Sequence, residues 1–168
     1  MSWFEALKRF SALATCTVVL AACGFHIRGD VPLPFRTLAI VGGEGSPFVV
    51  DLRRTLRGNV KVNLVERPEQ AEAVLYIVSN QNDKSILTLS GGGRVREFQL
   101  LQRVTFRVAD VNGGEWLPQS EISVRRDFSF NDSQALAKEG EERLLIADMQ
   151  VDAVQQLVRR LSTAKRPT

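Results

Sequence analysis

The chain has 168 residues, 44% of them hydrophobic, and a formal net charge of +3 from 22 Lys and Arg against 19 Asp and Glu. This length suits one ordinary domain with a core of its own, and the charge is too small to indicate binding to bulk nucleic acid. One histidine and two cysteines leave little material for a metal site or a disulfide framework.

The N-terminal segment is typical of an export signal. Lys8 and Arg9 precede an apolar run from Phe10 to Leu20, which is too short to span a bilayer as a stable helix. The run ends in Leu20-Ala21-Ala22-Cys23, which resembles the lipobox of bacterial lipoproteins, where the thiol is acylated and becomes the new N-terminus. The alternatives are an ordinary cleaved signal that happens to precede a cysteine, and an N-terminal anchor that stays on.

The lipobox predicts three parts of the chain. They are a lipoprotein signal peptide (1–22), an acylated tether (23–34) and a single α+β domain (35–168). In lipoproteins of Gram-negative bacteria an Asp after the acylated Cys is the inner-membrane retention signal, and here that residue is Gly24. We therefore expect a protein on the periplasmic side of the outer membrane, held there by its N-terminal acyl chains, since two such chains already give stable attachment.

The mature chain shows no pattern typical of an enzyme. Cys16 lies in the discarded segment, acylation would consume the thiol of Cys23, and the one histidine, His26, lies in the tether. The chain also lacks a Gly-x-Ser-x-Gly nucleophile motif and His-rich metal spacing. We therefore expect no catalytic residue, no metal and no cofactor.

The N-terminal part of the domain is predicted as strand, helix and short strand. After an extended tether we expect a strand over residues 35–41 and a glycine-rich loop over 42–45. Ser46-Pro47 then begins a helix, with Ser as N-cap and Pro in the first turn, and Gly58 ends it. Residues 60–65 suggest a further short strand, and 67–72 a turn or brief helical piece.

From residue 73 to 130 the hydrophobic period is two, which predicts long strands with one core face and one wet face. The predicted core-facing residues are Phe98, Leu100, Val104, Phe106, Val108, Ile122, Val124, Phe128 and Phe130. Leu75 and Ile77 share parity with Leu87 and Leu89, with a bulge or bend expected at the polar stretch 80–83. Gly91-Gly92-Gly93 turns the chain back, and strands of this length are expected to project beyond the cover of the helices.

A final helix is predicted over about residues 133–161, followed by a frayed tail from Lys165. Its predicted apolar stripe consists of Leu136, Leu144, Ala147, Val151, Val154, Leu157 and Leu161. The fold class that follows is α+β, a two-layer sandwich with two helices packed on one face of a largely antiparallel four-stranded sheet. The opposite face of the sheet is expected to be polar and uncovered.

The mature N-terminus and the C-terminal segments together resemble a known family. The run Cys23-Gly24-Phe25-His26-Ile27-Arg28-Gly29 is similar to the mature start of the LPS-assembly lipoprotein LptE family, which characteristically reads Cys-Gly-Phe-His-Leu-Arg-Gly. Phe128–Asp132, Ala135–Lys138 and Gln155–Leu161 look like the last strand and C-terminal helix of that family.

This resemblance implies a non-enzymatic partner of the LptD-like β-barrel that translocates lipopolysaccharide (LPS) to the outer leaflet. Members plug the barrel, support its assembly and bind LPS, and a polar sheet face suits a wet barrel lumen. The alternative is an outer-membrane lipoprotein that scaffolds or activates a cell-wall enzyme. A small periplasmic ligand carrier is a weaker alternative, because a two-layer sandwich of this size has little room for a closed apolar pocket.

Binding of LPS requires Lys or Arg to meet its phosphates and acidic sugars. The candidate ligand residues are Arg94 and Arg96 beside the triple-glycine turn, and Lys138, which lies in the segment that matches the family near the start of the last helix. The helical cluster of Arg53, Arg54 and Arg57 is the second choice, since it is better explained as a solvated face that complements the helix dipole.

Overall fold

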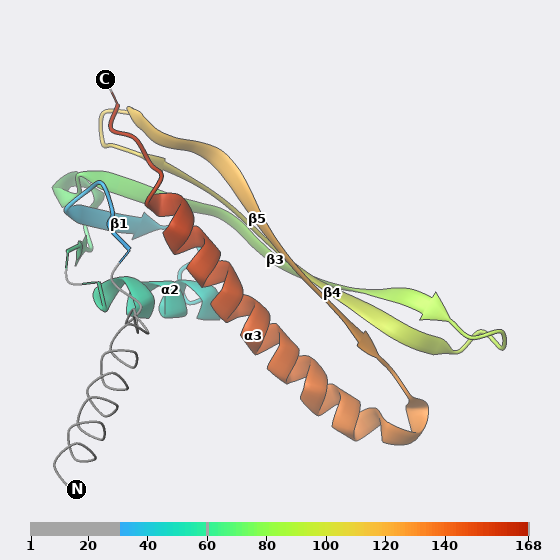
Figure 1. Cartoon of the computed structure of the whole chain (residues 1–168). Helices are drawn as coiled ribbons and strands as arrows, with labels where there is room; N and C mark the ends of the chain where they lie inside the picture. The colour runs from blue at the N-terminus through green and yellow to red at the C-terminus, as the bar shows by residue number, and fades with distance from the viewer. Residues whose placement is uncertain (1–30, 60, 168) are drawn as a thin grey trace, which may run out of the picture.

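The computed structural model describes residues 31–59 and 61–167 (Figure 1). The predicted signal peptide, Cys23, Gly24 and His26 lie outside the described residues. The helices are η1 (Pro68–Gln70), α2 (Pro47–Arg57), η2 (Asp132–Gln134) and α3 (Ala135–Leu161). The strands are β1 (Thr37–Val41), β2 (Asn63–Val65), β3 (Ala73–Leu89), β4 (Val95–Ala109) and β5 (Glu115–Ser129). None of the helices in the described part combines the length and apolarity that crossing a bilayer requires.

The sheet has five strands in the order β2-β1-β3-β4-β5 and is mixed, so the prediction of four largely antiparallel strands was wrong in this detail. β1 pairs in parallel with both β2 and β3, whereas β3, β4 and β5 form an antiparallel meander. Parallel neighbouring strands need a crossover connection, and helix α2 provides it between β1 and β2. The three-residue β2 lies at the edge of the sheet. The α+β class and the two helices on one face are confirmed (Figure 1).

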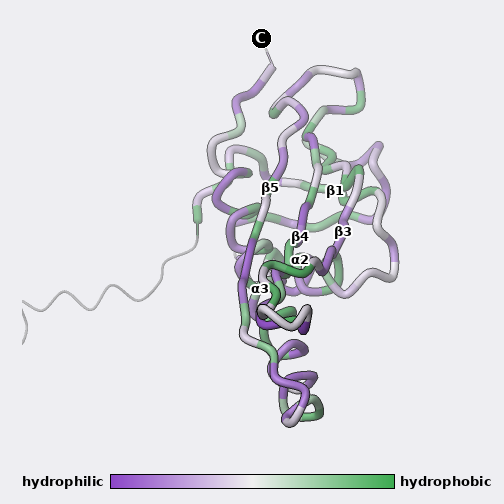
Figure 2. The backbone as a smooth tube through the Cα atoms, turned by 90° about the vertical axis from the view of Figure 1, so that its right-hand side faces the viewer, coloured by the Kyte–Doolittle hydropathy of each residue, from purple (hydrophilic) through white to green (hydrophobic). Residues whose placement is uncertain are grey.

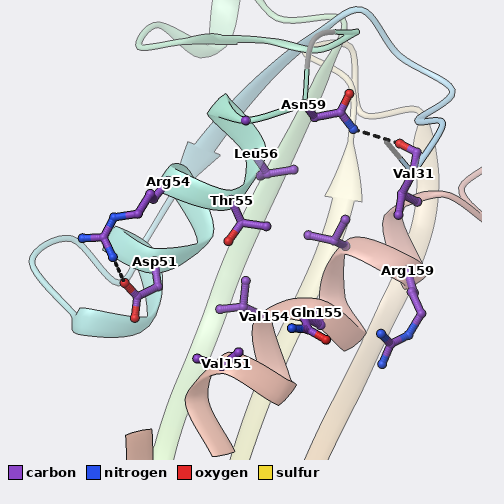
Figure 3. Close-up of a pocket in the computed structure, with 12 residues that line it drawn as sticks. Val31, Asp51, Arg54, Thr55, Leu56, Asn59, Val151, Val154, Gln155 and Arg159 are labelled. Atoms are coloured by element: carbon purple, nitrogen blue, oxygen red, sulfur yellow. Dashed lines mark hydrogen bonds and ion pairs between the residues drawn. The ribbon is translucent and has the colours of Figure 1, made fainter. Parts of the chain in front are cut away.

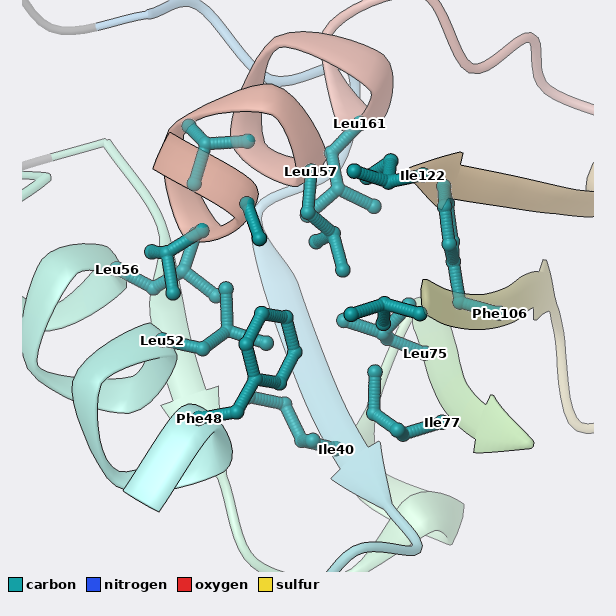
Figure 4. Close-up of a cluster of buried hydrophobic side chains, with 14 of the residues drawn as sticks. Ile40, Phe48, Leu52, Leu56, Leu75, Ile77, Phe106, Ile122, Leu157 and Leu161 are labelled. Atoms are coloured by element: carbon teal, nitrogen blue, oxygen red, sulfur yellow. The ribbon is translucent and has the colours of Figure 1, made fainter. Parts of the chain in front are cut away.

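The main core lies between the helices and this face of the sheet. Ser46 caps α2 as predicted, because its Oγ accepts a hydrogen bond from Val49 N at 3.2 Å. Phe48 and Leu52 of α2 point toward β1 and β3, while Leu157 and Leu161 of α3 lie over β4 and β5 (Figure 4). All four side chains are fully buried, which indicates that the packing of their apolar sides holds both helices on the sheet.

The long strands keep the predicted faces on β4 and β5. Leu100, Val104, Phe106, Ile122 and Val124 are buried, and the ends of the strands near the triple-glycine turn extend past the helices (Figure 1). In Figure 2 hydrophilic colouring runs along parts of β3, β4 and β5, in keeping with their wet face.

A β-bulge at Val78 overturns the expected parity of β3. Ile77 pairs with Phe106 but Ser79 pairs with Thr105, so Val78 is an extra residue and the alternation inverts after it. The polar stretch 80–83 pairs without a break, and the bulge precedes it. Further register shifts follow on either side of Thr88, so the simple alternation from Leu75 and Ile77 does not extend to Leu87 and Leu89, which are 44% and 56% exposed.

The second face of the sheet is polar along the long strands but not at the β1 end, where the prediction of a wholly polar face was wrong. A small second cluster forms there from Ala39, Ala71 and Val74, with Val41, Val65 and Tyr76 packed around it. The Arg107 guanidinium lies 4.2 Å from the centroid of the Tyr76 ring and covers part of this cluster.

The predicted stripe of α3 is buried only in its C-terminal half. Val154, Leu157 and Leu161 are buried, but Leu136 and Leu144 are 85% and 75% exposed. α3 lies over β5 and β4 along its length, and α2 covers only its C-terminal half. The N-terminal half therefore buries the side that faces the sheet, including Met149 with Ile146 packed against the core, and turns the predicted stripe to solvent.

The C-terminal tail is docked, so the prediction of a frayed tail was wrong for residues 165–167. Lys165 N donates to Trp116 O at 3.0 Å, and Arg166 forms an ion pair with Glu72 at 3.4 Å. Pro167 lies so close to Gly114 that a Cβ there would approach it to 2.9 Å. The tail thus closes over the end of the sheet where β5 begins.

Candidate functional site

The β3–β4 hairpin tip and the start of α3 enclose an open hollow of about 1040 Å³. Ser90 N donates to Arg94 O at 2.7 Å, Gly93 N donates to Ser90 O at 2.9 Å, and Gly93 has a φ of +76° that favours glycine. Arg94 N also donates to Ser90 Oγ at 3.2 Å. This turn holds the backbone at the hairpin tip, which forms the rim of the hollow. The hairpin tip extends beyond the part of the sheet that the helices cover (Figure 1).

The structure places all three candidate ligand residues around this one hollow. Arg94 and Arg96 come from the hairpin and Lys138 from the first turn of α3. The Arg94 and Arg96 guanidinium groups make no hydrogen bond or ion pair with other described residues. Lys138 is held more firmly, because its Nζ donates to Ser129 Oγ at 3.1 Å and to Glu141 Oε2 at 2.7 Å, and its side chain is only 15% exposed.

Acidic neighbours moderate the charge of the hollow. Glu97 and Asp132 also line it, and Glu97 Oε2 accepts a hydrogen bond from Thr88 Oγ1 at 3.0 Å. An anionic group at the rim would therefore meet the two unpaired arginines first. Lys138 would have to exchange its contact with Glu141 for the new anion.

Apolar residues also line the hollow, and sequence reasoning had not assigned them to the site. Leu89, Val95 and Phe130 line it beside the basic residues. Phe130 packs edge-on against Phe98, with ring centroids 5.2 Å apart, and Phe98 stacks on Phe128 at 5.7 Å. The shared parity of these three phenylalanines in the long strands was the signal available in the sequence.

The Lys84 ammonium group packs against this aromatic group. Lys84 Nζ lies 4.3 Å from the Phe98 ring centroid and donates to Glu142 Oε2 of α3 at 2.5 Å. Nearby, Arg126 of β5 donates to Asp148 and Asp152 of α3, and the hydrogen bond to Asp148 is the main reason that the pKa of Arg126 is raised. Charged contacts of this kind hold the outer part of α3 to the long strands.

The second-choice arginines do not converge on one site. Arg53 donates to Ile40 O at 3.3 Å, and Arg54 pairs with Asp51 at 2.9 Å. Arg57 is exposed in the last turn of α2. Within the described part of the chain, no group of three or more His, Cys, Asp or Glu is placed to hold a metal ion.

Comparison with known proteins gives consistent matches over most of the chain. The family model described as "LptE: Lipopolysaccharide-assembly" matches residues 35–161. An LPS-assembly lipoprotein LptE from Photorhabdus laumondii is 30% identical over 154 residues, which is 90% of this chain and 83% of the relative. The counterpart from Pectobacterium atrosepticum is 27% identical over 155 residues, with the same two coverages of 90% and 83%.

Solved structures of lipoproteins share the fold. The solution NMR structure of uncharacterized lipoprotein B from Nitrosomonas europaea is 41% identical, with a TM-score of 0.72, and the match covers 83% of this chain and 90% of that one. The crystal structure of rare lipoprotein B from Shewanella oneidensis is 27% identical, with a TM-score of 0.67 and coverages of 76% and 95%. Since the family model spans most of the domain and agrees with these relatives, the chain belongs to the LptE family of lipopolysaccharide-assembly lipoproteins.

Proposed function

We propose that this chain binds LPS in the hollow at the hairpin tip during delivery of LPS to the outer leaflet. The observation that carries the proposal is the meeting of Arg94, Arg96 and Lys138 with apolar residues that include Leu89 and Phe130. LPS is an amphiphile with phosphates close to acyl chains, so a binder needs charge-assisted donors beside apolar surface. The two unpaired arginines supply donors that can form bidentate bonds to phosphate.

The polar face of the long strands supports a second part of the function, which is to plug an LptD-like β-barrel translocon and support its assembly. This face of the ribbon consists mainly of Ser79, Gln81, Asp83, Ser85, Gln99, Arg103, Thr105, Glu121, Ser123, Arg125 and Asp127. Hydrogen bonds cross between the strands, for example Arg103 to Asp83 at 2.8 Å and Gln99 to Asp127 at 3.2 Å. The lumen of outer-membrane barrels is polar, so a surface whose one central apolar residue is Leu101 is suited to burial there.

The N-terminal sequence supports the location of the protein. Acylation of Cys23 after removal of residues 1–22 would attach the domain to a membrane, and Gly24 in place of Asp favours the outer membrane, on its periplasmic side. The acylated tether (23–34) then connects the anchor to the domain (35–168).

The LPS site is tested with charge reversal at the rim. In the full chain purified in detergent, Arg94→Asp with Arg96→Asp is expected to weaken binding of LPS at low salt several-fold. The matched control is Arg57→Asp with Arg160→Asp, which makes the same change in net charge at exposed positions far from the hollow. Equal weakening by both pairs would show that general charge, and not this hollow, controls binding.

The barrel partner is tested by co-purification of the tagged chain from solubilised outer membrane. A large β-barrel protein is expected with the wild type and with the rim variant, because the rim arginines are separate from the polar ribbon face. Recovery of a peptidoglycan synthase without a barrel would favour the alternative role as scaffold of a cell-wall enzyme.

A further inference from the structure

A groove between α2 and α3 has no part in the function proposed above. It has a volume of about 610 Å³, and both helices line it with apolar side chains (Figure 3). These are Leu56 of α2 with Val151, Val154 and Val158 of α3. Val151 is 50% exposed there, while Val154, three residues on, is buried. The groove therefore continues the core surface outward and leaves part of it uncovered.

The described chain begins at one end of this groove. Val31, the first described residue, lines it, and Val31 O accepts a hydrogen bond from Asn59 Nδ2 at 2.8 Å. Asn59 is only 7% exposed, and its Oδ1 accepts from Lys61 N at 3.1 Å. Buried amides need such partners, so this contact fixes where the tether reaches the domain. Figure 3 shows Val31 and Asn59 at one end of the groove and Asp51 and Val151 at the other.

The residues that precede Val31 match the groove in pattern. Between the predicted acylation site and Val31, the apolar residues are Phe25 and Ile27. In an extended segment, side chains two residues apart point to the same side, which would leave His26 and Arg28 on the other. Phe25 and Ile27 thus form a short apolar face in an otherwise polar or glycine-containing stretch.

The lengths match as well. Ile27 lies four residues before Val31, a reach of about 13 Å for extended chain. On α3, Val151 lies seven residues before Val158, a distance of about 10 Å along the helix. A segment running back from Val31 along the groove therefore brings Ile27 to the Val151 end.

The charges at the Val31 end of the groove favour the same arrangement. Arg159 lines the groove near Val31 (Figure 3) and makes no ion pair with the described residues. Asp30 immediately precedes Val31 and has the opposite charge. At the far end Asp51 is already paired with Arg54, so that end carries no unpaired charge against an apolar side chain.

We propose that residues 24–30 of the mature chain dock in the groove between α2 and α3, with Ile27 packed on Val151 and Phe25 about 7 Å further along, at the outer end of the groove. A docked segment shortens the free tether and holds the domain in one orientation to the membrane. The inference relies on the proposed cleavage at Cys23 only for the start of the segment, and it does not require LPS binding.

Disulfide trapping in the full-length chain tests the proposal. Processing removes Cys16 and acylates Cys23, so a processed chain has no other free thiol, and its mass reports separately whether acylation occurred. Ile27→Cys with Val151→Cys is expected to form an intramolecular disulfide in several-fold higher yield than two matched pairs. These are His26→Cys with Val151→Cys, which tests the alternation, and Ile27→Cys with Arg160→Cys, which tests an exposed position on the same helix.

A second measurement does not depend on engineered pairs. The thiol of Val151→Cys in the purified full chain is expected to react with a maleimide several-fold more slowly than the same thiol in a chain that also carries Phe25→Ser and Ile27→Ser. Equal disulfide yields in the three pairs would overturn the proposal. So would equal labelling rates, or protection that develops only when the barrel or a second copy of the chain is added, since another molecule would then occupy the groove.

Discussion

Truncation of Phe106 tests the assignment of the two faces of the sheet. Phe106 is 0% exposed toward the C-terminal end of β4, where Ile77 pairs with it on β3 (Figure 4). A buried aromatic side chain removes about 150 Å² or more from water, which at about 25 cal/mol per Å² amounts to about 4 kcal/mol. Phe→Ala substitutions in cores typically cost about 3 to 5 kcal/mol once the cavity is included, so Phe106→Ala is expected to lose that much unfolding free energy.

The matched control lies three residues away on the other face of the same strand. The Arg103 side chain is 43% exposed and pairs with Asp83, which is itself exposed, so the ion pair contributes at most about 1 kcal/mol. Its Nε is buried without a hydrogen-bond partner among the described residues, which lowers the cost of removing it. Arg103→Ala is therefore expected to cost well under 1 kcal/mol.

Urea unfolding of the purified chain, followed by circular dichroism, measures both variants. The slope with denaturant should stay unchanged, so that the midpoint alone reports the loss. A larger loss for Arg103→Ala than for Phe106→Ala would refute the reasoning, because it would mean that the register is inverted and the wet face is the core.

Three further predictions concern the backbone and the anchor. Gly42 has a φ of +89°, and a Cβ there would lie 2.5 Å from a carbonyl oxygen of β3, so Gly42→Ala is expected to lose more unfolding free energy than backbone strain alone, about 1 to 3 kcal/mol, would cost. The control in the same urea unfolding assay is Gly45→Ala, where φ is +79° and a Cβ would meet open space. Deletion of Val78 removes the unpaired bulge residue and leaves the pairing on both sides intact, so thermal unfolding should show a much smaller loss than deletion of Gln81, which shifts the register of the hairpin. Cys23→Ala is expected to abolish acylation and attachment to the outer membrane while the domain still folds; an acylated chain in the mass spectrum of this variant would show that the lipobox is assigned wrongly.

The candidate ligand residues were named from the sequence, but their common location was not determined by it. Arg94 and Arg96 stand beside the triple-glycine turn, so the sequence placed them at a strand end. Lys138 is more than 40 residues away along the chain, and only the packing of α3 on the long strands brings it to the same hollow. The apolar part of the lining was missed because Phe130 was counted as a core residue, whereas at the open end of the sheet it is only half-buried.

Periodicity identified the stripe of α3 but not what covers it. Leu144 has helical spacing with Val151, and Leu136 with Val154, and this spacing is a local property of the sequence. Whether such a stripe is buried depends on a neighbouring element, and α2 is too short to reach the first turns of α3. The same stripe is therefore core at one end and surface at the other.

The sequence by itself determined the order of the elements, the cap of α2 at Ser46, and the polar face of β4 and β5, because propensity, capping and alternation act over a few residues. Tertiary structure alone decided the pairing of β2 with β1, the bulge at Val78 and the docking of the tail at Trp116. These features depend on which distant strand offers a free edge or a free carbonyl, and the free energy of such contacts belongs to two segments at once. A pattern read along one segment carries no information about its partner, and this is why the place of β2 in the sheet and the shared hollow became visible only in the folded chain.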